Sequence, residues 1–256
     1  MKEFIISIDA GTTSNRSILF DLRGKPVYSS QKEFTQYFPK SGWVEHNPEE
    51  IWRTTVKTLK DVIQKAKRLN GKILTIGITN QRETTVLWDK KTGKPVYNAI
   101  VWQDRRQEDY CKNLRKQNKE NMIFNKTGLL IDSYFSGTKI KWILDNIPKA
   151  KQLMNKKQLM FGTIDSFLIW RLTRGSVHAT DATNASRTMI FNITTNKWDD
   201  AILKILKIKK HILPIVKDCA DDYGQTHSSI TGKSIPINGV VGDQQSATIG
   251  QCCFEP

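Results

Sequence analysis

The sequence contains few cysteines, and none of them has the C-x-x-C spacing that zinc sites and thiol-exchange enzymes use. The four cysteines among the 256 residues are Cys111, Cys219, Cys252 and Cys253. We therefore expect reduced thiols, as in a cytosolic protein.

Long apolar runs are also missing. The amino-terminal segment Met-Lys-Glu-Phe-Ile-Ile-Ser-Ile-Asp reaches Asp9 after an apolar run that is too short for a signal peptide. No later stretch approaches the length that a membrane-spanning helix needs. We expect a soluble, cytoplasmic protein without an integral membrane segment.

Positive charge is abundant but is not concentrated in one region. The formal net charge is +15, and the lysines are spread from Lys57 through Lys116 and Lys156 to Lys217. Such scatter is typical of a solvated surface. Because the sequence has no zinc knuckle, no RNP-like aromatic stripe and no basic heptad, we predict no nucleic-acid partner.

What is present suits a sizeable globular core, because 38% of the residues are hydrophobic. Strands are predicted at 4–8, 17–21 and 26–34, with turns between them that form an antiparallel meander. A helix begins with Asn47 as cap and Pro48 at its first position, continues to Ala66 on an apolar spacing, and is closed by Gly71. Further strands are expected at 73–79, 84–88, 96–102, 189–191 and 239–241, and helices at 104–119, 137–146, 150–155, 163–172 and 199–206.

The chain has no internal repeat and no linker rich in Pro, Gly or Ser, so these elements predict one compact α/β unit. The segment 242–248 is expected to run from a strand into a helix. Only eight residues follow Thr248, and we therefore expect the fold to continue in a further segment.

The first strand ends in a segment suited to phosphate. Asp9 is followed by the small-residue turn 11–14, which can offer backbone N–H groups and hydroxyls to phosphate while the carboxylate holds a hydrated Mg²⁺. Arg16 adds a cation. An ordinary hairpin turn would have the same composition, so these residues alone leave both interpretations open.

Two further segments have the residue types of a polyol site. The segment 80–85 reads Asn-Gln-Arg-Glu-Thr-Thr, in which Arg82 and Glu83 supply donors and acceptors for vicinal hydroxyls. Trp102 is an aromatic plate suited to a carbon backbone, and Asp104 behind it is expected to open a helix. A salt-bridged loop and a core tryptophan are the alternatives.

One apparent P-loop fails on its spacing. The segment 231–234 reads Thr-Gly-Lys-Ser, but His227 stands where the motif requires a glycine. Pro236 also excludes the helix that should follow. We therefore expect no Walker A site.

Resemblance to a known family resolves what the separate motifs leave open. Segments 7–14, 80–85, 102–106, 180–188 and 242–245 resemble, in this order, the amino-terminal half of glycerol kinases. Segment 134–146 is similar to the first signature of the wider FGGY family of carbohydrate kinases. The resemblance covers essentially the whole chain.

The resemblance implies an α/β, ribonuclease H-like and actin-like ATPase fold, the first domain of a two-domain sugar kinase that closes on ATP and substrate. It implies a domain over 1–250, with 251–256 as the start of a missing carboxy-terminal domain. The implied activity is ATP-dependent phosphorylation of glycerol to sn-glycerol 3-phosphate in glycerol catabolism. This chain alone is then expected to be inactive, and the full-length protein to be a homo-oligomer.

The resemblance also implies a role for each matching residue. Asp243 would be the catalytic base and would share Mg²⁺ with Asp9. The alternatives are another FGGY kinase, acting on a pentulose or another polyol, and a non-catalytic polyol-binding domain. Glycerol would contact Arg82, Glu83, Trp102, Tyr134, Asp243 and Gln244, and the ATP phosphates would contact Thr12, Thr13, Ser14 and Arg16.

Overall fold

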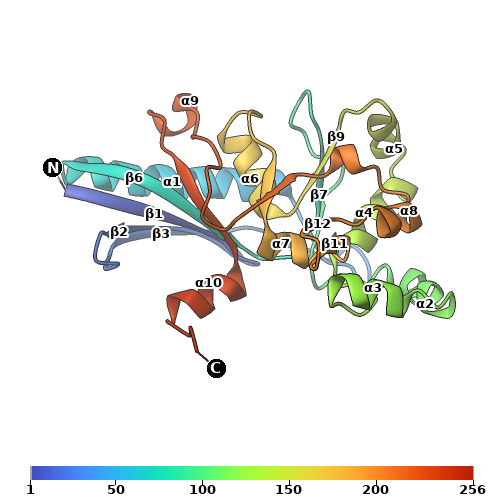
Figure 1. The fold of residues 1–256 in the computed structure, drawn as a ribbon. Helices are drawn as coiled ribbons and strands as arrows, with labels where there is room; N and C mark the ends of the chain where they lie inside the picture. Colours follow the sequence, from blue (N-terminus) through green and yellow to red (C-terminus); the bar gives the residue numbers. More distant parts are fainter. Residues whose placement is uncertain (1, 256) are drawn as a thin grey trace.

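The computed structural model describes residues 2–255 and is built on a five-stranded sheet of order β14-β6-β1-β2-β3 (Figure 1). The first three strands form the antiparallel meander that the sequence predicted. Strand β6 pairs with β1 in parallel, and β14 pairs in parallel with β6 at the edge of the sheet. The strands are β1 (Lys2–Ala10), β2 (Ser14–Asp21), β3 (Pro26–Glu33), β6 (Gly71–Asn80) and β14 (Ile237–Gly242).

One face of this sheet is buried. Phe4, Ile6 and Ile8 alternate along β1 and are at most 3% exposed, whereas the residues between them are less buried. The period of two in the sequence therefore becomes one apolar and one more open face. Asp9 lies on the more open face.

Helix α1 (Pro48–Arg68) packs along the sheet (Figure 1). Its cap is the predicted one, since Asn47 Oδ1 accepts from Glu49 N at 2.9 Å. The prediction that Gly71 closes the helix is wrong, because the helix ends at Arg68 and Gly71 is the first residue of β6. A Cβ at Gly71 would lie 2.2 Å from the Phe4 ring, so the glycine permits close packing.

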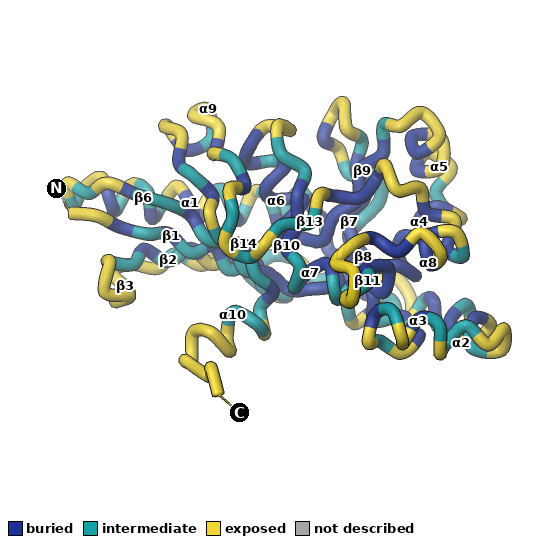
Figure 2. The backbone as a smooth tube through the Cα atoms, in the orientation of Figure 1, coloured by how far each residue is buried: buried dark blue, intermediate teal, exposed yellow. Residues whose placement is uncertain are grey.

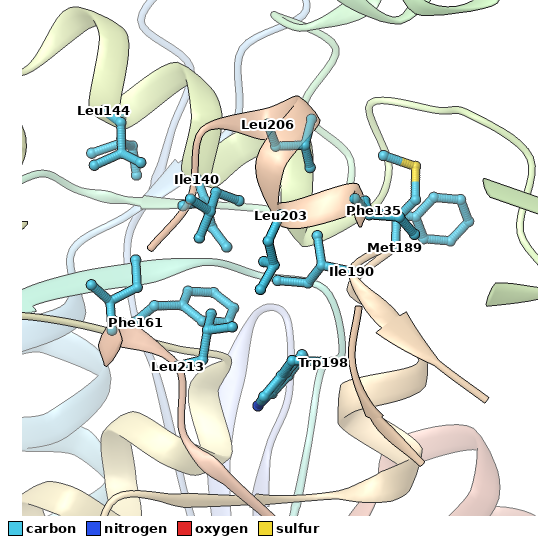
Figure 3. Packing of buried hydrophobic residues seen from close by; sticks show 14 of the residues in the cluster. Phe135, Ile140, Leu144, Phe161, Met189, Ile190, Trp198, Leu203, Leu206 and Leu213 are labelled. Carbon is cyan, nitrogen blue, oxygen red and sulfur yellow. The ribbon is translucent and has the colours of Figure 1, made fainter. Parts of the chain in front are cut away.

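A second apolar cluster lies outside the five-stranded sheet and is built from residues between Leu87 and Leu213. Figure 3 shows Ile140 and Leu144 of α4 (Ser136–Asn146), Leu203 and Leu206 of α8 (Asp200–Leu206) and Phe161 of β9 (Leu159–Gly162) converging in it. Helices α2 (Glu108–Lys116), α3 (Glu120–Thr127) and α5 (Pro148–Asn155) and strand β7 (Val86–Asp89) also belong to this second part of the molecule.

Helix α6 (Ile164–Leu172) is apolar on nearly every side. It contacts β6 of the five-stranded sheet and also β9, which belongs to the second part of the molecule. Ile169 and Leu172 pack in the same apolar cluster as Ile6 of β1. The ring centroids of Phe167 and Trp88 are 5.4 Å apart. A helix that is hydrophobic all round is expected to be buried, and this one is.

Two predicted elements are shorter than expected. The helix predicted at 104–119 begins at Glu108, because Asp104 is not a helix cap: its carboxylate accepts from Val44 N at 2.7 Å and pairs with Arg106 at 2.8 Å. The strand predicted at 96–102 is reduced to β8 (Ala99–Ile100). Elsewhere the predicted elements are present with shifted ends.

Several short elements were not predicted. Their bounds are β4 (Gln36–Tyr37), β5 (Glu45–His46), β10 (Ala179–Asp181), α7 (Ala182–Ser186), β12 (Lys197–Trp198), η1 (Lys210–Ile212), β13 (Ile215–Lys217) and α9 (Ser228–Thr231). The strand predicted at 189–191 is present as β11 (Phe191–Asn192).

The last helix, α10 (Asp243–Gly250), follows β14 directly, as the sequence predicted. It projects from the body of the molecule and none of its residues is buried (Figure 2). Among the helices within residues 2–255, none is both long enough and apolar enough to cross a membrane.

Candidate functional site

The candidate site lies where three parallel strands end. Asn80 at the end of β6 is in register with Ala10 of β1 and with Gly242 of β14. The segments that follow these residues therefore meet at one edge of the sheet, which is where open α/β sheets bind their ligands.

The turn after β1 is compact and partly exposed. Gly11 N donates to Ser14 O at 3.0 Å, and Arg16 Nη2 reaches back across the hairpin to Asp9 Oδ2 at 2.8 Å. The Arg16 and Asp9 side chains are 45% and 31% exposed. Because an ion pair this exposed contributes only about 0–1 kcal/mol, Arg16 can turn toward an anion at little cost.

Three side chains from other segments fix the same turn. Gln81 Nε2 donates to Gly11 O at 2.9 Å, and Gln36 Nε2 donates to Thr12 O at 3.0 Å. Trp102 Nε1 donates to Thr12 Oγ1 at 3.1 Å. The predicted phosphate turn and the predicted polyol residues are thus in direct contact.

Arg82 and Asp243 form the central ion pair. Arg82 Nε lies 2.8 Å from Asp243 Oδ1; the arginine side chain is 5% exposed and the aspartate side chain 45%. Gly242 allows this approach, because a Cβ there would lie 2.5 Å from Arg82 Cδ. The result is a partly exposed carboxylate held by a buried cation.

Glu83 adopts an unusual conformation beside this pair. Its φ is 59°, in the left-handed region, and the residue is 1% exposed. Its carbonyl accepts from Ser136 Oγ at 2.9 Å, and Oε1 accepts from Arg187 Nε at 2.7 Å. Burial raises the pKa of Glu83 above its ordinary value, while the Arg187 hydrogen bond and the charge of Arg82 oppose the rise.

Aromatic side chains line the next part of the site. The Trp102 and Tyr134 ring centroids are 5.6 Å apart and the rings are tilted by 59°. Buried Lys139 donates to Ser133 O at 2.9 Å and to Tyr134 O, which fixes the loop before α4. A hollow of about 360 Å³ opens beside Tyr134 and Arg187.

The structure brings most of the predicted residues together, with one difference. Gln244 is exposed on α10, and the amide that contacts Arg82 is that of Gln245, whose Oε1 accepts from Nη1 at 3.4 Å. Gln245 and Arg187 were missed as site residues. Both lie in segments that the resemblance singled out, at 242–245 and 180–188, but nothing in the sequence showed that they contact Arg82 and Glu83.

The carboxylates fit a metal that arrives with a nucleotide. Within residues 2–255 no three His, Cys, Asp or Glu side chains are grouped as a metal site. Mg²⁺ requires only one or two carboxylates when phosphates and waters complete its shell. Asp9 and Asp243 are both partly exposed carboxylates, although each is in its own ion pair.

Comparison with known proteins gives consistent likenesses. Residues 4–250 match the N-terminal domain of the FGGY family of carbohydrate kinases. The chain is 57% identical over 256 residues to a glycerol kinase of Rhizobium meliloti (strain 1021), with 100% of this chain and 52% of the relative covered. It is 55% identical over 255 residues to a glycerol kinase of Petrotoga mobilis (strain DSM 10674 / SJ95), with 100% and 51% covered.

Solved structures agree. Plasmodium falciparum glycerol kinase with ADP matches with a TM-score of 0.96 at 39% identity, covering 99% of this chain and 51% of that one. Gluconate kinase from Lactobacillus acidophilus matches with a TM-score of 0.86 at 27% identity, covering 98% and 50%. The α/β architecture is thus the ribonuclease H-like, actin-like ATPase fold, and the chain spans about half the length of the curated relatives it matches.

Proposed function

The chain belongs to the FGGY family of carbohydrate kinases, and from this premise we propose that the protein phosphorylates glycerol with ATP to give sn-glycerol 3-phosphate. The observation that carries the proposal is the Arg82–Asp243 pair of 2.8 Å at the edge of the sheet, beside the turn after β1. The identity of 57% to a glycerol kinase supports glycerol as the acceptor. Glycerol catabolism is the proposed role.

Asp243 is the proposed general base. Its Oδ1 already accepts from Arg82 Nε and from Gln244 N, each at 2.8 Å, so the proton of the attacking hydroxyl would go to Oδ2. The arginine orients the carboxylate. Phosphoryl transfer depends mainly on such positioning and on charge stabilisation, so little further covalent chemistry is required.

Glycerol would be bound by groups that flank this carboxylate. Arg82 and Glu83 would donate to and accept from its hydroxyls, and Trp102 and Tyr134 would pack against its carbons. We keep Gln244 as a proposed contact. Its neighbour Gln245 already contacts Arg82.

The turn after β1 would bind the ATP phosphates. The donors there are backbone N–H groups and hydroxyls of 11–14 together with Arg16. Asp9 and Asp243 would hold Mg²⁺, which neutralises charge on the transferring phosphoryl group. The proposed phosphate contacts are Thr12, Thr13, Ser14 and Arg16.

The domain arrangement is also proposed. Residues 1–250 would form the amino-terminal domain and 251–256 would begin a second domain, since the relatives are about twice as long. Closure of two domains would exclude water from the transfer, so the 256 residues alone would be inactive. We place the full-length protein in the cytoplasm, where ATP is available, as a homo-oligomer.

The test is a substrate panel on the full-length protein. With ATP and Mg²⁺, glycerol should have the highest kcat/KM among glycerol, erythritol, xylulose and gluconate. A higher value for a pentulose or for gluconate would reassign the substrate within the family. Glycerol binding without ADP formation would favour a non-catalytic polyol-binding protein.

A further inference from the structure

The short helix α7 contacts both segments that carry the central ion pair. Asp181 caps it, with Oδ2 accepting from Thr183 N at 2.8 Å and Oδ1 from Asn184 N at 3.1 Å. Asp181 and Asn184 are completely buried. Hydrogen bonds made by buried side chains therefore fix the position of α7.

The first contact reaches β14. Gly242 N donates to Thr183 Oγ1 at 2.8 Å, and the Thr183 hydroxyl in turn donates to Asp181 Oδ2. Gly242 immediately precedes Asp243. The position of the Asp243 backbone is therefore tied to one threonine hydroxyl.

The second contact reaches β6. Asn184 and Asn80 exchange hydrogen bonds between their side-chain amides, at 3.0 and 3.1 Å, and both residues are fully buried. Asn184 Nδ2 also donates to Asp181 Oδ1 at 2.7 Å. Asn80 lies two residues before Arg82, so the same helix holds the other half of the ion pair.

The third contact reaches Glu83. Arg187, at the end of α7, donates through Nε to Glu83 Oε1 at 2.7 Å. Its guanidinium carbon lies 5.0 Å from the Phe135 ring centroid and 5.7 Å from that of Tyr134. The left-handed Glu83 is thus held in its strained conformation by an ion pair and by the Ser136 hydroxyl.

We propose that segment 181–187 is a positioning clamp, in which Thr183 sets the place of Asp243 and Arg187 sets the orientation of Glu83. The proposal rests on the proposed function, because it assigns these residues to the reaction of that same site. The clamp links groups that are 161 positions apart in the chain, so a small shift of α7 would change the Arg82–Asp243 geometry. Displacements of about 1 Å can cost roughly 10²-fold in rate.

The first experiment substitutes Thr183 in the full-length protein. Thr183→Val keeps the shape but removes the acceptor for Gly242 N, so kcat should fall by about 10- to 100-fold while the glycerol KM changes less. Thr183→Ser retains the hydroxyl and should restore most of the rate. The matched control is Thr194→Val, at an exposed position between β11 and β12.

The second experiment substitutes Arg187. Arg187→Met should raise the glycerol KM by about tenfold with a smaller change in kcat, because Glu83 loses the donor that orients it. The increase in KM should grow as the pH falls, since removing Arg187 removes a contact that favours the ionised carboxylate. Arg23→Met, in the exposed turn between β2 and β3, is the control.

A third measurement does not require activity. Hydrogen exchange at the Gly242 amide should accelerate by at least about tenfold in Thr183→Val and should stay slow in Thr183→Ser. Thermal melts would identify a Thr183→Val protein that does not fold. In that case exchange at the Gly242 amide is compared between Thr183→Ser and Thr183→Ala, and only the alanine variant should exchange faster.

The outcomes separate the two proposals. An inactive wild-type protein would reject glycerol phosphorylation, and Gly242 exchange would still decide whether the clamp exists. An active wild-type protein with unchanged kcat and unchanged Gly242 exchange in Thr183→Val would overturn the clamp. Equal losses in Thr183→Val and Thr183→Ser would overturn it as well.

Discussion

Asp9 and Asp243 are two carboxylates at the ends of strands in the same sheet, but their partners differ. Asp9 pairs with Arg16, which is 45% exposed, whereas Asp243 pairs with Arg82, which is 5% exposed. A buried cation cannot move away without leaving an unpaired charge, while an exposed one can. Asp243 is therefore the better oriented of the two, and Asp9 the better able to exchange its partner for a cation.

This difference predicts separable defects in the full-length protein. Asp243→Asn keeps the side-chain shape but cannot take a proton, so kcat should fall by roughly 10²–10⁴-fold with a much smaller change in glycerol KM. Asp9→Asn weakens the hold on Mg²⁺, so added Mg²⁺ should recover part of its loss. Steady-state kinetics over a range of Mg²⁺ concentrations measure both. Recovery of Asp243→Asn by Mg²⁺ to the same extent would refute its role as base.

Substitution of Arg82 should impair glycerol binding. Arg82, Glu83, Tyr134 and Asp243 all lie in this chain, so the 256 residues should bind glycerol weakly, at millimolar concentrations, without a second domain. Calorimetry should detect this binding, and Arg82→Ala should abolish it because Asp243 loses its partner as well. Arg23→Ala should bind normally; binding that survives in Arg82→Ala would place the pocket elsewhere.

At the scale of elements, the loop before α4 depends on one buried lysine. Lys139 is 1% exposed and donates to the carbonyls of Ser133 and Tyr134. Burial lowers the pKa of Lys139 to about 7, while nearby carboxylates such as that of Glu83 oppose the change. Helix α4 thus fixes the loop that precedes it, and with that loop the position of the Tyr134 ring.

We expect Lys139→Met to lower the free energy of unfolding by about 1–3 kcal/mol, because two carbonyls lose their buried donor. The glycerol KM should rise at the same time, since the Tyr134 loop is released. Urea unfolding and kinetics measure the two effects. Lys151→Met, at an exposed position of α5, is the control and should change neither.

At the scale of the whole molecule, α6 joins the two halves and begins beside a buried acid. Asp165 is 0% exposed and accepts from Thr180 Oγ1 at 2.6 Å. Burial raises the pKa of Asp165 to about 7, and the charge of Asp181 adds to the rise. Folding therefore favours the protonated acid, and this contribution to stability is present below about pH 4 and is lost as the pH rises to about 7.

Asp165→Asn should remove that dependence. Relative to the wild type, the variant should gain stability as the pH rises from 5 to 8, by an amount of the order of a few kcal/mol. We expect His178 to give a pH dependence of stability with the opposite sign. Burial lowers the pKa of His178 to about 4, so its contribution to stability is lost as the pH falls below about 6.5. Urea unfolding across this pH range measures both. A constant difference between Asp165→Asn and wild type would contradict the prediction.

Local patterns were enough for the regular elements. The meander over 4–34 follows from alternating apolar residues and polar turns, and α1 from its Asn47 cap and the spacing that continues to Ala66. These features depend on residues within a few positions of one another. Asp104 shows the limit, because its partner Val44 is 60 positions away and removes it from the predicted helix end.

The sequence by itself determined the elements of the sheet, the family resemblance and the residue types at the site. Only the tertiary structure decided which of those residues meet, because Arg82 and Asp243 are 161 positions apart and Glu83 and Arg187 are 104 apart. The short elements β10 and α7, which the sequence did not predict, have too few residues to be stable alone. They form because buried hydrogen bonds with distant segments stabilise them, and such bonds exist only after the chain has packed.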